Sequence, residues 1–217
     1  LDAKLKNSQD IVVTNSEHTN AAVNFYKTNA NIKSYFKTNT NQITLFPGFI
    51  SKSVDGELTT LGRGGSDYTA AILASALHVK ELQIWTDVSG MFTTNPKLVS
   101  QALPIHEISY QEAVELSHFG AKVLYPPTVQ PVLNKKIPIW IKNTMAPDDH
   151  GTLISNECSN SSSRPVKGIS NINDIALLTL QGNGMVGIPG FSKRLFETFA
   201  QEKINIILIT QASSEHS

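Results

Sequence analysis

The sequence has few of the features that commonly identify a secreted, membrane or nucleic-acid-binding protein. Its 217 residues include one cysteine, Cys158, which cannot form an internal disulfide and fits a reducing, cytoplasmic environment. Lys plus Arg and Asp plus Glu each number 18, so the formal net charge is zero, and neither a nucleic acid nor a membrane is expected as a partner. No apolar run approaches the roughly 18 to 20 residues that span a bilayer, and no signal peptide is visible.

Motifs for metal binding and for a catalytic nucleophile are missing as well. The six histidines are scattered, with neither His-x-His nor His-Glu-x-x-His spacing, so no protein-bound metal is expected. Nothing resembles the surroundings of a nucleophilic Ser or Cys. The chain starts at Leu1 without an initiator methionine and stops at Ser217 just after an apolar, strand-like run, so we interpret both ends as cuts.

Short apolar runs alternate with helical patterns, which is typical of α/β layers. Strands are predicted at residues 43–46, 82–85, 137–141, 175–180 and 204–209. Helices are predicted at residues 68–77, 110–119 and 191–201. Ser109 and Glu112 can form a capping box at the start of the second helix. Residues 156–164 are polar and Ser-rich, as a linker would be. We predict a first domain at 1–157, a linker at 158–165 and a partial second domain at 166–217.

The strongest chemical signal is residues 61–68, LGRGGSDY, which open a predicted helix. Glycines directly before a helix let backbone N–H groups face an anion, and the helix dipole favours negative charge there. Arg63 adds a planar fork suited to a carboxylate or a phosphate, and Ser66 is a candidate helix cap. The alternative is a tight turn with a solvated Arg63 and a Ser66 that only caps the helix; local physics leaves the two equally open.

The second signal is residues 85–97, WTDVSGMFTTNPK. Ligands of open α/β sheets bind beyond the carboxyl ends of the strands. A buried strand is predicted to end at Trp85, which would place Thr86 and Asp87 at such an end, within reach of a phosphate for Lys97. The alternative, which the local pattern slightly favours, is an ordinary loop in which Asp87 makes an Asx turn.

The third signal is residues 119–127, FGAKVLYPP. Gly120 is a plausible helix C-cap. Lys122 follows the end of that helix, where a cation is favourable even without a ligand. For this segment the interpretation as an ordinary helix end without a ligand is therefore the stronger one.

Residues 182–187, GNGMVG, match the Gly-x-Gly-x-x-Gly pattern of dinucleotide-binding folds. Such a site needs an acidic residue after the next strand to hold the ribose hydroxyls. Here that strand is followed by Thr210 and Gln211. The missing acidic residue therefore argues against a nicotinamide cofactor, and a turn that binds a small amino acid fits better.

Taken together, these segments resemble the aspartokinase family. Residues 60–70 resemble its substrate-loop signature, residues 85–97 its nucleotide loop and residues 119–124 its third motif. Weaker similarity covers residues 1–29 and 46–50. The motifs occur in the family's order and spacing, and the resemblance spans essentially the whole chain. It implies the C-terminal part of an amino-acid kinase α/β/α sandwich, followed by an ACT-type βαβ regulatory module.

The resemblance also implies an activity: phosphorylation of L-aspartate to 4-phospho-L-aspartate by ATP with Mg²⁺, in the biosynthesis of threonine, methionine and lysine. It implies that Arg63 binds the α-carboxylate of aspartate and that Asp67, as the catalytic residue, organises the reacting end. The other implied substrate contacts are Gly64, Gly65 and Ser66. The implied nucleotide contacts are Thr86, Asp87, Phe92, Lys97, Lys122 and Val123.

Three positions depart from the family pattern. Phe92 stands where Tyr is common, so a hydroxyl contact is lost. Lys97 stands where Arg is common, which keeps the charge and loses the fork. Asn95 replaces a common Asp. These departures concern the detail of nucleotide binding and leave the class of enzyme unchanged.

The tail, residues 209–217, is most similar to the threonine-sensitive bifunctional aspartokinase/homoserine dehydrogenases. The resemblance implies threonine or lysine as effector, a homo-oligomer formed by pairing of ACT modules, and a strand of a second ACT module at residues 166–170. The implied effector contacts are Met185, Val186, Gly187, Ile188, Pro189, Gly190 and Gln211. The alternative is that this turn only packs a helix on a strand and binds nothing.

Family members carry a Lys-Phe-Gly-Gly motif whose lysine neutralises the transferring phosphoryl group, and this sequence has none. The chain by itself is therefore expected to be inactive. An alternative from another class is a stand-alone amino-acid-sensing module with a non-catalytic kinase remnant. Another amino-acid kinase is a further alternative, against which the Arg63 loop and the ACT segment argue.

Overall fold

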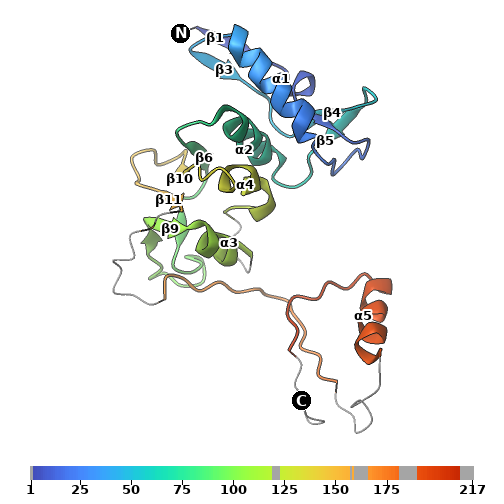
Figure 1. The fold of residues 1–217 in the computed structure, drawn as a ribbon. Coiled ribbons are helices and arrows are strands. Elements are labelled where there is room, and N and C mark those ends of the chain that lie inside the picture. The colour runs from blue at the N-terminus through green and yellow to red at the C-terminus, as the bar shows by residue number, and fades with distance from the viewer. Residues whose placement is uncertain (1, 119–122, 157, 159–165, 181–189, 211–217) are drawn as a thin grey trace. The chain divides into compact units, whose positions relative to one another are not determined.

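The computed structural model describes residues 2–118, 123–156, 158, 166–180 and 190–210 (Figure 1). The chain divides into two compact units, Leu1–Ile172 and Asn173–Ser217. The expected domain limits of 1–157, 158–165 and 166–217 stay a prediction, and most of the expected linker lies outside the described residues. Within the described ranges no helix is long and apolar enough to cross a membrane.

The first unit alternates strands and helices, as the sequence predicts. Its strands are β1 (Ala3–Leu5), β2 (Val13–Thr14), β3 (Ile43–Leu45), β4 (Ile50–Ser53), β5 (Leu58–Thr60), β6 (Leu82–Thr86), β7 (Met91–Phe92), β8 (Pro104–Ile105), β9 (Glu107–Ser109), β10 (Ile139–Asn143) and β11 (Thr152–Ser155). Its helices are η1 (Ser8–Asp10), α1 (Phe25–Thr38), α2 (Gly65–Leu77), α3 (Tyr110–His118) and α4 (Pro126–Leu133). The strands pair in the orders β6-β10-β11-β9, β2-β4-β5, β1-β3 and β7-β8.

The four-stranded sheet carries the edge on which the candidate site is built. β6 and β10 are parallel, with Thr86 opposite Asn143, so both strands end at the same edge. β11 runs antiparallel to β10 and parallel to β9. β6 lies at the end of this strand order, and its side chains alternate between buried and exposed. Trp85 lies on the exposed face of β6 and is itself 46% exposed. The prediction of a buried strand ending at Trp85 is therefore wrong for this face of the strand.

The main core lies between this sheet and the helices α2 and α4, which pack on each other. Small side chains let α2 approach closely: Ala71 and Ala74 are buried against Val129 and Val132 of α4 and the strand residues of the sheet. A second cluster, around Ile32 of α1, packs on the other residues of α2. α2 is therefore fixed on both sides, which holds its first turn in place.

The predicted capping box at the start of α3 is confirmed. The Ser109 backbone N–H donates to Glu112 Oε2 at 2.9 Å, and the Glu112 N–H donates to Ser109 Oγ at 3.2 Å. The Tyr110 hydroxyl donates to the carbonyl of Ile137, and burial raises the pKa of Tyr110 to about 12. The helix is thus fixed at its first turn by both backbone caps and a buried side chain.

In the second unit the structure describes one helix, α5 (Phe191–Gln201), at the predicted place. The strands predicted at 175–180 and 204–209 are wrong for this structure, because both segments are described without strand pairing. Leu177 is 91% and Leu208 81% exposed. A sheet of only two short strands is marginally stable, so an apolar sequence alone does not form strands in this unit. The strand predicted at 166–170 is also absent, and this segment belongs to the first unit.

Candidate functional site

The predicted substrate loop forms a left-handed turn in front of α2. Gly62 has φ +71° and Gly64 φ +66°, a region that favours glycine. Gly64 is the N-cap and has no side chain to accept from the first-turn amides. The prediction of Ser66 as the cap is wrong, because α2 already begins at Gly65 and Ser66 is an exposed residue of its first turn. The Gly65 N–H donates to the Gly62 carbonyl at 3.1 Å, and no side chain caps the other first-turn amides, which suits solvent or a bound anion.

A neighbouring turn packs tightly against this helix start. A Cβ on Gly48 would lie 2.8 Å from Ser66 Cα, and one on Gly65 would lie 2.7 Å from the Phe49 ring. The Phe49 N–H donates to Thr69 Oγ1 at 3.1 Å, and that hydroxyl donates to the Gly65 carbonyl at 2.8 Å. Phe49 itself has φ +76°, a strained value for a bulky side chain. Such strain, held by surrounding contacts, is characteristic of binding sites.

Arg63 links the first and third motifs. Its side chain is exposed, and its guanidinium carbon lies 5.3 Å from the centre of the Tyr125 ring, a cation–π geometry. Tyr125 precedes α4 directly and follows the third motif. Of the predicted nucleotide contacts in that motif, Val123 is half-buried and packs on the main core, whereas Lys122 lies outside the described residues. The helix cap predicted at Gly120 lies outside them too.

Asp67 is a half-buried carboxyl group in the first turn of α2, and burial raises its pKa. Among the described residues its carboxylate has no hydrogen-bond partner. A carboxylate that is partly removed from water without a partner is unfavourable for folding, and such groups concentrate at functional sites. The helix dipole offsets part of this unfavourable term, since Asp67 is near the positive end of α2.

The nucleotide loop, residues 85–97, begins at an edge of the sheet that lies on the same side as the first turn of α2. α2 packs on β6 and leads into it through four residues, so helix and strand run in opposite directions. The start of α2 and the end of β6 therefore lie on the same side. Thr86 Oγ1 donates to Asp87 Oδ1 at 3.0 Å. Among the described residues no backbone N–H donates to the Asp87 carboxylate, so the Asx turn of the alternative interpretation is not formed. That the loop binds a nucleotide stays a prediction.

Sequence reasoning missed the second half of this edge, which comes from the end of β10. Asn143 Nδ2 donates to Ser89 Oγ at 2.9 Å, and the Ser89 hydroxyl in turn hydrogen-bonds to the Asp149 carboxylate. Lys142 Nζ lies 5.9 Å from the centre of the Trp85 ring and 5.5 Å from that of Trp140, two cation–π contacts. The signal available in the sequence was the polar run that follows the predicted strand at 137–141. These residues hold the loop that follows Asp87.

A buried threonine fixes the next part of the loop. Thr152 is completely buried; its hydroxyl accepts from the Met91 N–H at 2.7 Å and donates to the Ile105 carbonyl at 2.6 Å. Gly90 has φ +109°, and a Cβ there would lie 2.4 Å from the Thr152 hydroxyl oxygen. The predicted nucleotide contact Phe92 follows in β7 and pairs with Pro104. The backbone at Phe92 is therefore set by contacts on both sides of the loop.

Lys97 is exposed at the far end of this loop. The Lys97 N–H donates to Asn95 Oδ1 at 3.0 Å, so Asn95 makes an Asx turn. Aspartate offers the same acceptor, which explains why the departure from the family pattern at this position is compatible with the same turn.

The predicted effector contacts lie almost entirely outside the described residues, which include Gly190 alone of that set. Gly190 has φ +83° and is the N-cap of α5. The described part of the turn thus has the same design as the start of α2: a left-handed glycine before a helix.

Comparison with known proteins agrees with this arrangement. The sequence matches the amino acid kinase family over residues 2–143 and an ACT domain over residues 178–217. A bifunctional aspartokinase/homoserine dehydrogenase of Haemophilus influenzae is 45% identical over 177 residues, which are 82% of this chain and 22% of that protein. The chloroplastic bifunctional aspartokinase/homoserine dehydrogenase 2 of Arabidopsis thaliana is 36% identical over 222 residues, 100% of this chain and 24% of that protein. The chain thus spans roughly a quarter of the length of these relatives.

Solved structures give the same result. E. coli aspartokinase III in complex with aspartate and ADP has a TM-score of 0.76 and 32% identity, covering 97% of this chain and 47% of that one. The same enzyme in complex with lysine and aspartate has a TM-score of 0.76 and 33% identity, covering 99% of this chain and 47% of that one. The chain therefore belongs to the amino acid kinase family, as an aspartokinase-type member with an ACT domain after its kinase fold.

Proposed function

We propose that the protein containing this chain is an aspartate kinase, which transfers the γ-phosphoryl group of ATP to the side-chain carboxylate of L-aspartate. The observation that carries the proposal is the start of α2. There a left-handed glycine turn precedes the helix without a side-chain cap, and the same turn carries the exposed Arg63 fork, a combination suited to a small carboxylate. The relatives named above support the substrate, since one is solved with aspartate and ADP.

The proposed roles follow the arrangement of the site. Arg63 binds the α-carboxylate of aspartate, with Gly64, Gly65 and Ser66 beside it. Asp67 organises the reacting end and is the proposed catalytic residue. Thr86, Asp87, Phe92, Lys97, Lys122 and Val123 surround the nucleotide. To these we add Asn143 and Ser89, which fix the loop between Asp87 and Phe92.

Mg²⁺ belongs to the proposal as the ion that accompanies ATP. This ion is commonly held by one or two carboxylates together with substrate phosphates and water. Asp67 and Asp87, on the same side of the sheet, are a donor set of that kind; in the described ranges no three His, Cys, Asp or Glu side chains form a dedicated metal cluster. The ion would supply positive charge to the phosphoryl group.

The chemistry asks little of the protein beyond position and charge. An aspartate carboxylate, with a reference pKa of about 3.9, is ionised at neutral pH and attacks phosphorus without a general base. The chain's own residues therefore orient the substrate and neutralise charge, which are the main contributions to phosphoryl transfer.

A hydroxamate assay tests the proposal. The complete protein, given ATP, Mg²⁺ and hydroxylamine, should form hydroxamate only when aspartate is present. If aspartate adds no product over glutamate or no substrate, the protein is not an aspartate kinase. Effector binding without any phosphorylation would favour the alternative of a regulatory module with a kinase remnant.

Regulation belongs to the same proposal. We propose threonine or lysine as the effector of the ACT domain, at Met185 to Gly190 and Gln211, and a homo-oligomer formed by ACT pairing in the cytoplasm. The ACT match and a related structure with lysine support an amino-acid effector. Titration calorimetry with the two amino acids distinguishes them.

A further inference from the structure

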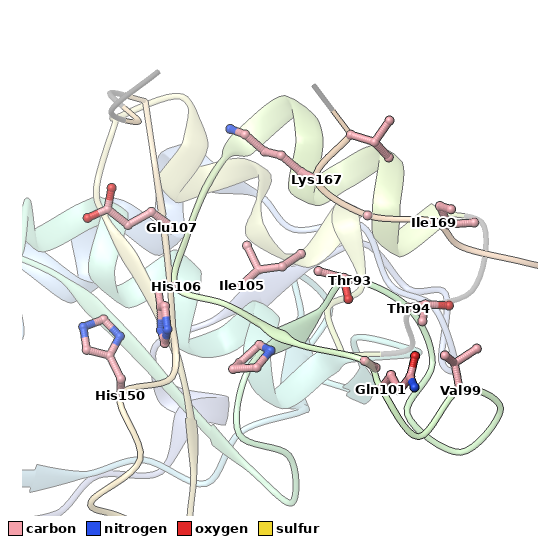
Figure 2. A pocket seen from close by; sticks show the side chains of 14 residues that line it. Thr93, Thr94, Val99, Gln101, Ile105, His106, Glu107, His150, Lys167 and Ile169 are labelled. Carbon is pink, nitrogen blue, oxygen red and sulfur yellow. The ribbon is translucent and has the colours of Figure 1, made fainter. Parts of the chain in front are cut away.

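A short segment of the first unit, residues 166–169, lies beside the nucleotide loop and contacts it at Thr93. We call it the strap. Figure 2 shows Lys167 and Ile169 of the strap near Thr93 and Thr94 of the loop, around an open pocket of about 930 Å³. Thr93 directly follows Phe92, one of the proposed nucleotide contacts. The strap ends three residues before Ile172, where the first unit ends and the ACT-bearing unit follows in the chain.

The strap is joined to the loop through the backbone. The Ile169 N–H donates to the Thr93 carbonyl at 2.7 Å. On its other side Thr93 is paired with Leu103: the Thr93 N–H donates to the Leu103 carbonyl at 2.9 Å, and the Leu103 N–H donates to Thr93 Oγ1 at 3.0 Å. Thr93 is therefore held from two directions, and the strap supplies one of them.

The strap is also joined to α3 by an ion pair. Lys167 Nζ lies 2.9 Å from both carboxylate oxygens of Glu112, the residue that forms the capping box of α3. Burial alone would raise the pKa of Glu112, yet the hydrogen bonds from Lys167 and Ser109 and the charge of Lys167 lower it to about 2. Glu112 thus fixes the helix start and the strap with a single carboxylate.

Between these two attachments the backbone of the strap passes close to α3 and to the loop, so that a side chain there would be tightly packed. A Cβ on Gly168 would lie 3.0 Å from Leu116 Cδ1 and 3.4 Å from the Thr93 carbonyl oxygen. Glycine at this position lets the backbone reach Thr93 while it packs on α3. Three separate contacts, at three successive residues, therefore hold the strap against both the loop and the helix.

From these contacts we infer that Lys167 and Gly168 are positioning residues for nucleotide binding: the strap they anchor holds Thr93, and through it Phe92 and the loop to Lys97, in the geometry that binds ATP. The inference rests on the proposed function, because it assigns the loop to the nucleotide. It assigns neither residue a direct contact with a substrate.

Lys167→Gln in the complete protein tests the inference. The ion pair is partly exposed, so its loss should raise KM for ATP by about two- to fivefold, the upper part of the range for such pairs, with KM for aspartate changed less than about twofold. Lys167→Arg keeps the cation and should restore KM for ATP. Lys6→Gln is the matched control, because it removes a similar ion pair, with Asp10 at 2.7 Å, on another element of the same unit. Gly168→Val should act as Lys167→Gln does.

Hydrogen exchange supplies a readout that does not depend on catalysis. Lys167→Gln should speed exchange of the Ile169 amide and of residues 92–99, while Lys6→Gln should leave both unchanged. An unchanged KM for ATP, or an equal rise of both KM values, overturns the inference where the wild-type protein is active. If the wild-type protein phosphorylates no aspartate, the proposed function fails. The role of the strap in holding the loop is then tested by hydrogen exchange alone. Unchanged exchange at residues 92–99 in Lys167→Gln refutes that role, and faster exchange supports it.

Discussion

The guanidinium of Arg63 lies against the ring of Tyr125, 5.3 Å from its centre, and so joins two segments that are 62 positions apart in the sequence. A cation–π contact restrains the side chain without using its N–H donors, which stay available for a carboxylate. A side chain that is already oriented loses less conformational entropy when a ligand binds. The geometry thus favours Arg63 as a substrate-binding residue over a solvated arginine.

Replacing Arg63 by alanine should weaken aspartate far more than ATP. Loss of a charge-assisted, two-bond contact costs about 1.5 to 3 kcal/mol, or roughly 10- to 150-fold in KM for aspartate. Arg63→Lys keeps the charge without the fork and should fall between wild type and alanine. Steady-state kinetics with each substrate varied in turn measure both effects. A rise in KM for ATP with KM for aspartate unchanged would show that Arg63 does not bind aspartate.

Asp67→Asn should abolish phosphorylation without loss of stability. Burial raises the pKa of Asp67, so its carboxyl group favours folding at low pH, and that contribution is lost as pH rises through the raised pKa. At pH 7 the neutral amide escapes the unfavourable burial of charge, and the variant should unfold at equal or higher urea concentration than wild type. Towards pH 4 the difference should shrink. Asp148→Asn, at an exposed position, is the control and should change neither property.

Local patterns predicted α2, α3 and α5 but missed α1 and α4, and they did not show the long-range part of the site. The capping box of Ser109 and Glu112 lies within four residues, so its chemistry is visible in sequence. The Asn143–Ser89 contact joins positions 54 apart, and only the parallel pairing of β6 and β10 brings them together. The polar run after the predicted strand at 137–141 marks Asn143 as a strand-end residue, but no local signal pairs it with Ser89.

The failed predictions have a similar origin. Apolar runs at 175–180 and 204–209 predict strands by composition, yet a strand also needs a neighbour to satisfy its backbone. Residues 166–170 were assigned to a second ACT module, whereas Lys167 pairs with Glu112 of the kinase fold. The conformation of these segments depends on tertiary contacts, which the composition does not show.

The Glu112 carboxylate should give a pH-dependent contribution to stability. Its pKa is lowered to about 2 from an ordinary 4.5, so the contribution is present above pH 4.5 and is lost as pH falls towards 2. Because the group is partly exposed, Glu112→Gln should cost only about 0.5 to 1 kcal/mol at pH 7. Urea unfolding at pH 7 and pH 3.5 measures it, and the cost should be smaller at the lower pH. Glu115→Gln, on the exposed face of the same helix, should be neutral at both; a cost that grows at low pH would contradict the assignment.

Gly90→Ala should be strongly destabilising, by about 2 to 4 kcal/mol. The substitution adds backbone strain at φ +109° and a clash with the buried Thr152 hydroxyl, 2.4 Å away. Gly56→Ala is the matched control: it has a similar strained φ of +91°, but its Cβ would meet nothing closer than 3.9 Å. The difference between the two unfolding free energies isolates the clash. Equal costs would mean that Thr152 moves freely and does not fix the loop.

Threonine or lysine should bind at the turn before α5, and Gln211→Ala should weaken that binding. The described end of the turn supports a carboxylate site: Gly190, at φ +83°, is the N-cap of an 11-residue helix and supplies no side-chain cap to its first-turn amides. A free amino acid also presents an ammonium group, and the amide oxygen of Gln211 is a suitable acceptor for it. Loss of one hydrogen bond to a charged group costs about 1.5 to 3 kcal/mol, so affinity should fall by roughly 10-fold or more. Titration calorimetry of the complete protein with threonine, and then with lysine, measures this on wild type and variant. Equal affinity of both proteins for either amino acid would exclude Gln211 from the site, and no heat with either would leave the turn as a purely structural contact between helix and strand.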